Sequence, residues 1–465
     1  MPDSSDSPSF SKLALRPDLL ENLTSLAYLH MTPIQAESLP PILAGRDVIA
    51  QAKTGSGKTA AFALGILQKL DVKNFHIQAL VICPTRELAD QVASEIRRVA
   101  RSIHNIKVLT LCGGMPFGPQ ITSLGHGTHI VVGTPGRLED HLGKGRLKLD
   151  KVETLVLDEA DRMLDMGFQA VLDVIVEQLP RGRQTLLFSA TFAVQIQAAS
   201  KRVMNNPLMV RVDASHDTDS IVQLFYRVEG EKGRLTALRL LLQKHRPESS
   251  LVFCNTRRET RELADALVSD GFSALSLHGD MDQKDRDQTL VQFSNNSASI
   301  LVATDVAARG LDIAAVDAVF NFHIAHEPEV HVHRVGRTGR AGNKGHAYTF
   351  FSEREEYKLE LLDVDTGLNS RARLPSQDVL QKSRLQPRYT TLQLGVGKRQ
   401  KVRPGDILGA LTGEKGIQGS SVGKIKVADN WSYVAIETAF AKAAHNKLVS
   451  GKLKGRSCRV RFLRH

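Results

Sequence analysis

"DVIAQAKTGSGKTAAFALGILQKL", residues Asp47 to Leu70, is the stretch that decides the fold of the first part of the chain. Its first six residues are mostly apolar, as in a buried strand, and the apolar residues of "GKTAAFALGILQKL" recur at helical spacing. A glycine-rich loop joins the two. A strand that passes through a short loop into a helix is the unit from which parallel sheets covered by helices are built.

The same alternation of strand and helix recurs along most of the chain. It continues in "QALVICP", "TRELADQVASEIRRVA", "HIVVGTP", "TLVLDEA" and "QTLLFSA". A polar stretch, "VDASHDTDS" at 212–220, has no apolar period and is interpreted as a linker. The alternation then restarts with "SSLVFCN". The sequence therefore predicts two α/β domains in tandem, residues 1–211 and 221–367, each with a parallel sheet, and a cleft between them.

The last part of the chain has a different pattern. Residues 368–389 show no clear strand pattern and are interpreted as a connector that is partly helical. In residues 390–465, the segments "TTLQLGV", "RPGDILGALTGEKG", "VGKIKVAD", "WSYVAIE", "TAFAKAAHNKLVSG" and "CRVRFL" predict the order β-α-β-β-α-β. This order is typical of small α+β RNA-recognition modules. Three domains also agree with a length of 465 residues at about 150 residues per domain.

The net charge lies in this last domain. Residues 390–465 hold fifteen Lys and Arg against four Asp and Glu, whereas residues 1–389 hold 46 of each, so the net charge of +11 comes from the end of the chain. A nucleic-acid module attached to a neutral protein explains this distribution. A solvated basic tail that serves solubility is the alternative.

Other classes of protein are disfavoured. The four cysteines form no CxxC pair, so neither a zinc site nor a disulfide framework is expected. No stretch approaches the about 18 unbroken apolar residues of a membrane span. The first residues, "MPDSSDSPSF", lack the basic start and apolar core of a secretory signal. We expect a cytoplasmic protein with reduced thiols and no membrane partner.

The loop "AKTGSGKT" matches the P-loop pattern G-x-x-x-x-G-K-[ST] except at its first position. Backbone N–H groups at a helix start can hold phosphates, Lys58 can reach their outer oxygens, and Thr59 can ligate Mg²⁺. The alternative is a plain glycine-rich turn, which the flanking strand and helix disfavour. The predicted nucleotide contacts are Ala52, Lys53, Thr54, Gly55, Ser56, Gly57, Lys58 and Thr59.

The segment "LVLDEAD" ends a predicted strand in a run of acidic residues. Such a run can be only a solvated turn. Beside a P-loop, however, Asp158 is well placed to hold Mg²⁺ and Glu159 to orient the attacking water. The two motifs together predict a nucleotide hydrolase, with Lys58, Asp158 and Glu159 as catalytic residues and Thr59 and Asp158 as metal ligands.

Further short motifs complete a pattern. They are "PTRELA" (84–89), "TPGR" (134–137), "SAT" (189–191), "ATDVAARGLD" (303–312) and "HRVGRTGR" (333–340). With "DEAD" itself, in this order and spacing, the chain resembles the DEAD-box RNA helicases over residues 10 to 365. The resemblance implies that the two α/β domains are RecA-like and that the protein hydrolyses ATP and unwinds RNA locally.

The resemblance also implies an adenine site around "TPIQ". Gln35 would hydrogen-bond the adenine edge, Tyr28 would pack on its face, and Thr32 would touch the phosphate loop. The chain departs from the family pattern at Ala27 and Met31, where Gly and Pro are commoner. For Tyr28, an ordinary core position is the alternative.

Arg337 and Arg340 lie three residues apart, and no acidic residue occurs from Val330 to Lys344, so they need an external anion. By resemblance they are arginine fingers that the second domain supplies to the γ-phosphate held by the first, which makes hydrolysis depend on closure of the cleft. Asp312 would contact the ribose. Ser189 and Thr191 would couple the γ-phosphate to the closed form.

RNA would be contacted along its backbone, which makes the affinity dependent on salt and largely independent of sequence. For any one of these positions, a solvated surface residue is the alternative. By resemblance the contacts are Arg86, Gly114, Thr134, Arg137, Arg286 and Thr304.

The end of the chain resembles the C-terminal domain of the DbpA group of these helicases. In that group the domain recognises a hairpin of large-subunit (23S) ribosomal RNA, and the helicase acts in 50S subunit assembly, so that RNA and pre-ribosomal particles are the implied partners of a monomeric protein. Because the predicted strands offer only Trp431 and Tyr433 for stacking, we expect recognition by basic side chains. These are Lys398, Arg399, Lys401, Lys424, Lys426, Arg459 and Arg461.

Two other functions remain open at this point. An ATP-gated RNA clamp with incidental unwinding is one, although such a clamp could lose Glu159, Arg337 and Arg340, and all three are present. A DNA helicase or DNA-dependent ATPase is the other. Only the family resemblance disfavours it, because no single residue proves a contact with a 2′-hydroxyl.

Overall fold

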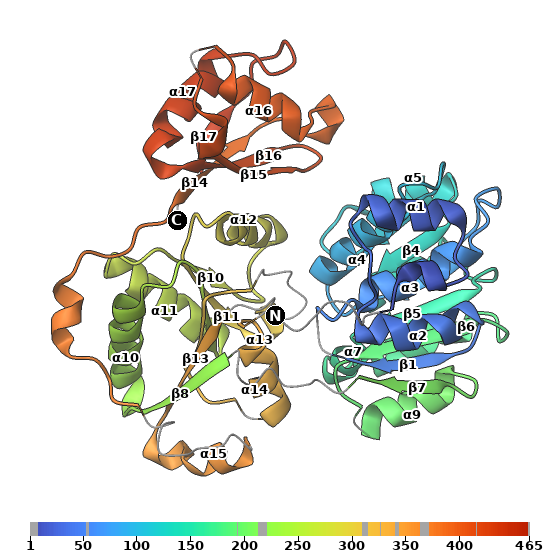
Figure 1. Ribbon diagram of the computed structural model, residues 1–465, viewed down its shortest axis with the longest axis horizontal. Helices are drawn as coiled ribbons and strands as arrows, with labels where there is room; N and C mark the ends of the chain where they lie inside the picture. The colour runs from blue at the N-terminus through green and yellow to red at the C-terminus, as the bar shows by residue number, and fades with distance from the viewer. Residues whose placement is uncertain are drawn as a thin grey trace. The chain divides into compact units, whose positions relative to one another are not determined.

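Figure 1 shows a computed structural model of the chain, in which the described residues form two compact units. One unit holds a parallel sheet, and the other holds a second parallel sheet and a small antiparallel sheet. We call the three parts the first domain (8–212), the second domain (221–362) and the terminal domain (389–463). The structure describes residues 8–52, 55–192, 194–212, 221–308, 315–325, 327–339, 344–362, 372–414 and 416–463.

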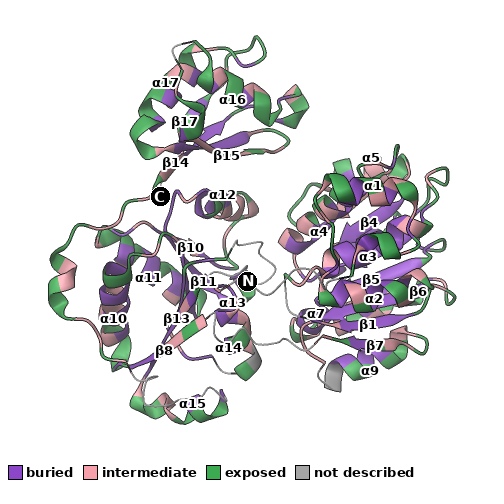
Figure 2. Cartoon of the chain, viewed as in Figure 1, coloured by how far each residue is buried: buried purple, intermediate pink, exposed green. Residues whose placement is uncertain are grey.

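The first domain is built on a seven-stranded parallel sheet in the order β3-β4-β2-β5-β6-β1-β7. Its strands are β1 (Val48–Gln51), β2 (Ala79–Ile82), β3 (Val108–Leu111), β4 (Ile130–Gly133), β5 (Thr154–Asp158), β6 (Gln184–Ser189) and β7 (Leu208–Arg211). Its helices are α1 (Pro17–Ser25), α2 (Pro33–Leu43), α3 (Lys58–Lys69), α4 (Arg86–Val99), α5 (Phe117–Gly125), α6 (Pro135–Gly143), α7 (Ala160–Asp165), α8 (Gln169–Glu177) and α9 (Val194–Val203). Apart from Gln51 at the end of β1, the strands between the two edges are buried, whereas the helices expose their outer faces (Figure 2), as in parallel sheets covered by helices.

Two strands of this sheet, β3 and β7, were not predicted. They are its two edge strands. Three residues of β3 are only partly buried, and β7 exposes Met209 and Arg211. Because an edge strand has one neighbour and less cover, its sequence lacks the continuous apolar run that marks a central strand.

The second domain has a six-stranded parallel sheet in the order β10-β11-β9-β12-β13-β8. Its strands are β8 (Ile221–Arg227), β9 (Ser250–Cys254), β10 (Ala274–Leu277), β11 (Ile300–Thr304), β12 (Ala318–Asn321) and β13 (Gly345–Phe351). Its helices are α10 (Gly230–His245), α11 (Arg257–Ser269), α12 (Gln283–Ser294), α13 (Asp305–Ala308), α14 (Pro328–Val335) and α15 (Tyr357–Leu361). The prediction of two parallel α/β domains is therefore confirmed.

The terminal domain confirms the predicted β-α-β-β-α-β order. Its elements are β14 (Tyr389–Leu394), α16 (Pro404–Thr412), β15 (Val422–Val427), β16 (Ser432–Glu437), α17 (Ala441–Ser450) and β17 (Val460–Phe462). The strands form an antiparallel sheet in the order β15-β16-β14-β17. Alternate residues such as Leu392 and Val434 pack with Ile407 and Leu448 of the two helices in one core.

The opposite face of the terminal sheet contacts the second domain. Tyr433 packs with Val291 of α12 and is 2% exposed. The hydroxyl of Thr391 accepts a hydrogen bond from Asn295 Nδ2 at 3.1 Å and lies 2.6 Å from the hydroxyl of Ser297. Burial raises the pKa of Tyr433 to about 12. The ring of Tyr433 is therefore not available for stacking on a base.

The connector between the second and terminal domains packs along the second domain. Its described part, from residue 372 on, contains a 3-10 turn at Gln377–Gln381. The amide of Gln243 donates to the carbonyl oxygens of Lys382 and Ser383 at 2.9 and 3.1 Å. The predicted linker at 212–220 lies outside the described residues beyond its first position. None of the helices in the described ranges combines the length and the apolar character that crossing a membrane requires.

Candidate active site

The predicted nucleotide motifs meet at one edge of the first sheet. The P-loop follows β1, the "DEAD" residues begin at the end of β5, and "SAT" begins at the end of β6. These strands are neighbours in the order β5-β6-β1 and run parallel, so their carboxyl ends lie side by side. In open α/β sheets this edge is where ligands bind.

The P-loop is held in a conformation that needs glycine. Gly55 and Gly57 have φ values of 85° and 94°, in the left-handed region. A Cβ atom at Gly57 would lie 2.5 Å from Nε2 of Gln35 and 2.9 Å from the hydroxyl oxygen of Thr32, so both side chains would have to shift. Lys58, at the start of α3, is buried, and its Nζ donates to the carbonyl oxygen of Ala52 at 2.6 Å. The ammonium group thus spans the loop that a phosphate would enter.

Two further observations fit a bound phosphate. The hydroxyl of Ser56 is buried and has no hydrogen-bond partner among the described residues. Thr59 follows in the first turn of α3, where it is partly buried. A helix start with backbone N–H groups and an unpaired buried hydroxyl is suited to an anion.

The adenine motif is joined directly to the P-loop. Gln35 accepts from the backbone N–H of Thr32 at 2.9 Å and donates to the carbonyl oxygen of Gly57 at 3.0 Å. Ala27 has a φ of 59°, in the left-handed region that favours glycine. The structure therefore links the two motifs through the amide that was predicted to contact adenine.

Tyr28 is only partly buried and its hydroxyl is hydrogen-bonded. The hydroxyl donates to Glu95 of α4 at 3.1 Å, and the guanidinium of Arg98 lies 5.0 Å from the ring centre. Burial is the main cause that raises the pKa of Tyr28, and the negative charge of Glu95 is the second. The ring thus packs against the core at one side, in agreement with part of the alternative that it is a core aromatic.

Asp158 carries a buried carboxyl group whose pKa is raised. It is 3% exposed at the end of β5. Burial raises its pKa to about 7, an effect that Lys58 reduces and Glu159 increases. A divalent cation would favour the ionised carboxylate, because it restores the charge compensation that burial removes. The carboxyl group of Asp158 is therefore suited to act as a metal ligand.

Glu159 sits at a strained turn. Its φ of 51° is in the left-handed region, where residues other than glycine are uncommon. Its carboxylate accepts from Nη1 of Arg162 at 2.8 Å, and both side chains are buried. The turn directs Glu159 to the same edge of the sheet as Asp158, because it follows that residue at the end of β5.

Asp161 is a site residue that the sequence reasoning did not single out. Its Oδ2 accepts from the backbone N–H groups of Ala190 and Thr191 at 3.1 Å. The hydroxyl of Ser189 donates to the carbonyl oxygen of Thr191 at 2.6 Å. Asp161 therefore joins the acidic motif to the predicted coupling residues. The only sequence signal for it was its place in the acidic run.

The predicted RNA contacts of the first domain gather at the other half of the same edge, after β2, β3 and β4. A guanidinium nitrogen of Arg86 lies 3.2 Å from the sulfur of Met115, and Nη1 of Arg137 donates to the carbonyl oxygen of Met115 at 2.9 Å. Gly114, with a φ of 72°, precedes Met115, and Thr134 is the N-cap residue just before α6. The structure therefore brings these four predicted residues together.

The second domain presents a comparable edge. Thr304 ends β11, and Arg286 of α12 donates through Nη2 to the carbonyl oxygen of Ala307 at 2.9 Å. Arg337 follows α14 and is buried. Four predicted site residues lie outside the described ranges, namely Lys53, Thr54, Asp312 and Arg340.

The seven basic residues predicted to bind RNA in the terminal domain do not form one cluster. Three lie in the loop after β14, two on β15 and two at or beside β17. Strands β15 and β17 are the opposite edges of the sheet. Nζ of Lys424 donates to the carbonyl oxygen of Ser294 in the second domain at 2.8 Å. The residues of the loop are Lys398, Arg399 and Lys401, those of β15 are Lys424 and Lys426, and those at β17 are Arg459 and Arg461.

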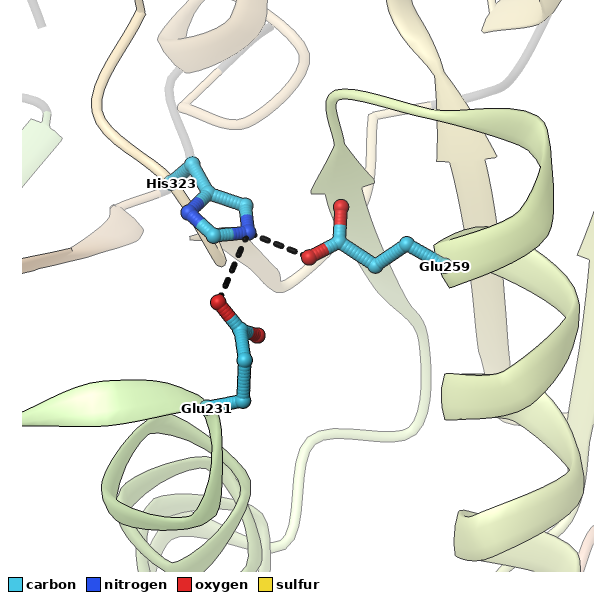
Figure 3. A group of neighbouring side chains, drawn as sticks. All are labelled: Glu231, Glu259 and His323. Carbon is cyan, nitrogen blue, oxygen red and sulfur yellow. Dashed lines mark hydrogen bonds and ion pairs between the residues drawn. The ribbon is translucent and has the colours of Figure 1, made fainter.

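One further group of titratable side chains lies at the carboxyl edge of the second sheet (Figure 3). Nε2 of His323 is hydrogen-bonded to Glu259 and lies 3.8 Å from a carboxylate oxygen of Glu231. Within the described part of the chain, no other His, Cys and carboxylate group has the spacing of metal ligands. Burial raises the pKa of Glu259, but hydrogen bonds from His323 and from backbone N–H groups outweigh it, and the pKa lies below its usual value. We interpret this group as a hydrogen-bonded cluster and assign no metal to it.

The fold and the site define a class of protein, a P-loop nucleotide hydrolase with two parallel-sheet domains and a basic RNA-recognition-like domain. Family models agree with this class along the chain. Residues 32–199 match the DEAD/DEAH box helicase model, residues 233–342 the helicase conserved C-terminal domain, and residues 391–462 the DbpA RNA binding domain.

The relatives are more specific. The ATP-dependent RNA helicase DbpA of Escherichia coli (strain K12) is 52% identical over 459 residues, which cover 98% of this chain and 100% of that protein. The DEAD-box ATP-dependent RNA helicase CshA of Geobacillus kaustophilus is 44% identical over 77% of this chain and 76% of that protein. The structure of S. cerevisiae Dbp5 bound to RNA and ADP BeF3 superposes with a TM-score of 0.70 and 31% identity, and covers 80% of this chain and 96% of that one.

The chain belongs to the DEAD-box ATP-dependent RNA helicases, and its terminal domain is of the DbpA type. The predicted family, the two RecA-like domains and the ATP-dependent helicase activity are confirmed.

Proposed function

We propose that this helicase acts on structured large-subunit (23S) ribosomal RNA during assembly of the 50S subunit, and that its terminal domain holds a hairpin of that RNA. The observation that carries the proposal is the basic terminal domain, because residues 390–465 hold the net charge of the chain and match a DbpA RNA binding domain. A helicase core that contacts RNA through phosphates selects poorly by sequence. Selection of a particular RNA therefore falls to the attached domain.

We assign the ATP chemistry to the carboxyl edge of the first sheet. The P-loop, with Lys58 and Thr59, holds the phosphates, and Thr59 and Asp158 hold Mg²⁺. Glu159 orients the attacking water, and Arg337 and Arg340 from the second domain stabilise the transferred phosphate. The support is the loop geometry, the unpaired hydroxyl in it and the raised pKa of Asp158.

The remaining positions have proposed roles as well. Gln35, Tyr28 and Thr32 form the adenine site, Asp312 contacts the ribose, and Ser189 and Thr191 couple the phosphate to closure. RNA backbone runs along the residues at β2 to β4 of the first domain and along Arg286 and Thr304 of the second. ATP and RNA both engage the two parallel-sheet domains, so that hydrolysis and phosphate release reset the RNA clamp.

We also propose that the protein works as a monomer in the cytoplasm, on pre-ribosomal particles. The widely spaced cysteines, typical of reduced thiols, support this location. The domain limits proposed are 1–211, 221–367 and 390–465, with a linker at 212–220 and a connector at 368–389.

The RNA itself is identified by crosslinking the helicase to RNA in cells and sequencing the bound fragments. We expect the reads to concentrate in one hairpin region of 23S ribosomal RNA. Reads spread over unrelated messenger RNAs in proportion to their abundance would contradict the proposed target.

A double variant tests the terminal domain more sharply than its deletion, because deletion would uncover Val291 and the polar side chains that hold Thr391. In Lys398→Gln with Arg399→Gln, we expect the concentration of 23S ribosomal RNA that gives half-maximal ATPase to rise at least about tenfold, since charged contacts are lost. Stimulation by an unrelated RNA of equal length should not change. ATPase assays with both RNAs measure this.

The matched control removes the same charge elsewhere. Lys151 and Lys442 are both exposed. Lys151 belongs to the first domain, and Lys442 lies in α17, outside the loop that holds Lys398 and Arg399. Lys151→Gln with Lys442→Gln should leave the preference for ribosomal RNA intact. If both double variants lose the preference equally, net charge rather than the loop selects the RNA.

A further inference from the structure

Arg334 of α14 is the largest of the fully buried side chains among the described residues. A buried guanidinium requires nearby partners for its charge and its donors. Nε and Nη2 donate to the two carboxylate oxygens of Asp305, both at 2.7 Å. This bidentate pair fixes the orientation of both side chains more tightly than a single contact could.

The other contacts of Arg334 anchor the pair to the sheet. Nη1 donates to the carbonyl oxygen of His323 at 2.8 Å, and the guanidinium lies 5.2 Å from the ring centre of Phe253. Phe253 belongs to β9, His323 follows β12, and Asp305 follows β11. Arg334 thus ties α14 to the carboxyl ends of three neighbouring strands.

On the Asp305 side of the pair lie two proposed RNA contacts. Asp305 directly follows Thr304 and begins α13. The carbonyl oxygen of Ala307, in the same helix, accepts from Nη2 of Arg286. Any shift of Thr304 or Arg286 on binding RNA therefore acts on the segment that carries Asp305.

On the Arg334 side lies the proposed arginine finger. Arg337 follows three residues later, and its backbone N–H donates to the carbonyl oxygen of Arg334 at 3.1 Å. The carbonyl oxygen of Arg337 accepts from the N–H of Val316 at 3.0 Å. The position of Arg337 is therefore set by the same short stretch of backbone that the buried pair holds.

We propose that the Arg334 and Asp305 pair is a positioning element, which transmits the binding of RNA at Thr304 and Arg286 to the placement of Arg337. The proposal rests on the roles assigned above to these three residues. Buried ion pairs are poor sources of net stability, because desolvation offsets their attraction, so a purely stabilising role would not require this bidentate geometry. The pair instead makes α13 and α14 move together.

The test compares ATPase turnover with saturating RNA to turnover without RNA. Arg334→Lys keeps the charge but loses the bidentate contact, and Asp305→Asn keeps the shape but loses the charge. In each, we expect RNA stimulation of kcat to fall at least about tenfold, because a misplaced catalytic group costs this much or more. RNA affinity measured without nucleotide should change by less than about threefold, since the phosphate contacts remain. The two changes together should be no worse than either alone.

A matched buried pair in the same domain separates positioning from stability. Arg234 is 4% exposed, donates to the carbonyl oxygens of Phe322 and Phe350 at 2.7 and 2.9 Å, and is paired with Glu355. We expect Arg234→Lys to lower the Tm about as much as Arg334→Lys while RNA stimulation is kept. Equal loss of stimulation in both variants would overturn the positioning role. If Arg334→Lys does not fold, Asp305→Asn carries the same comparison.

A variant of the finger itself keeps the two proposals apart. Arg337→Lys should lower kcat with RNA at least as far as Arg334→Lys does. Normal turnover in Arg337→Lys would overturn the proposed finger. Normal RNA stimulation in Arg334→Lys and Asp305→Asn, beside an inactive Arg337→Lys, would overturn only the positioning role.

Discussion

Glu159→Gln is expected to lower ATP turnover by about 100-fold to 10,000-fold, because it removes the group proposed to orient and activate the attacking water. Binding should survive. The glutamine side chain keeps the size of Glu159 and one acceptor oxygen for Arg162, with which Glu159 is paired at 2.8 Å. Because phosphate release is proposed to reopen the RNA clamp, the variant should hold RNA and ATP together for much longer than the native protein.

The measurement is the dissociation rate of a labelled RNA in the presence of excess ATP, together with single-turnover hydrolysis. Glu177→Gln is the matched control, since Glu177 is exposed in α8 of the same domain, and it should turn over ATP at the native rate. If Glu159→Gln hydrolysed ATP within a few-fold of the native rate, the proposed role of Glu159 would be wrong. If it lost hydrolysis and also released RNA rapidly, the link between hydrolysis and RNA release would be wrong.

Most of the fold could be predicted from sequence because the central strands are buried on both faces. "TLVLDEA" and "QTLLFSA" become β5 and β6, in which every residue is buried. The same reasoning failed at β3, β7 and β8, which lie at the edges of their sheets and carry exposed residues or partly buried ones. In the terminal domain the six elements were all found, because a small sheet with helices on one face shows clear two-residue alternation.

Candidate site residues could be proposed from the sequence where each occupies a place in a motif, but not where the residue acts through contacts with a distant segment. Lys58, Asp158 and Glu159 could be proposed because each occupies a fixed place in a motif. The contacts of Asp161 with Ala190 and Thr191 join segments about 30 positions apart, and no local pattern specifies such a pairing. The contact of Tyr433 with Val291 likewise depends on how the terminal domain packs on α12.

Asp158→Asn is expected to abolish turnover and, at the same time, to stabilise the protein. Loss of the carboxylate that is proposed to hold Mg²⁺ should lower kcat at least about 100-fold. The stability effect follows from the pKa of Asp158, which burial raises to about 7 from an ordinary value of 3.8. Between these two values the unfolded chain has lost its proton while the folded protein keeps it, so stability falls as the pH rises. Above about pH 7 the full cost of a buried negative charge is present.

Asparagine cannot ionise, so the variant escapes that cost. At pH 8, without nucleotide, its free energy of unfolding should exceed that of the native protein by about 2–4 kcal/mol. The gain should shrink as the pH is lowered from about 8.5 to about 5.5, because the native carboxyl group then takes up its proton. Thermal unfolding of both proteins over this range checks the sign and the pH window. A gain that stayed constant with pH would show that Asp158 is already ionised at the acidic end of the range and that its environment does not favour the protonated form. The raised pKa of Asp158 would then no longer support its proposed role as a ligand of Mg²⁺.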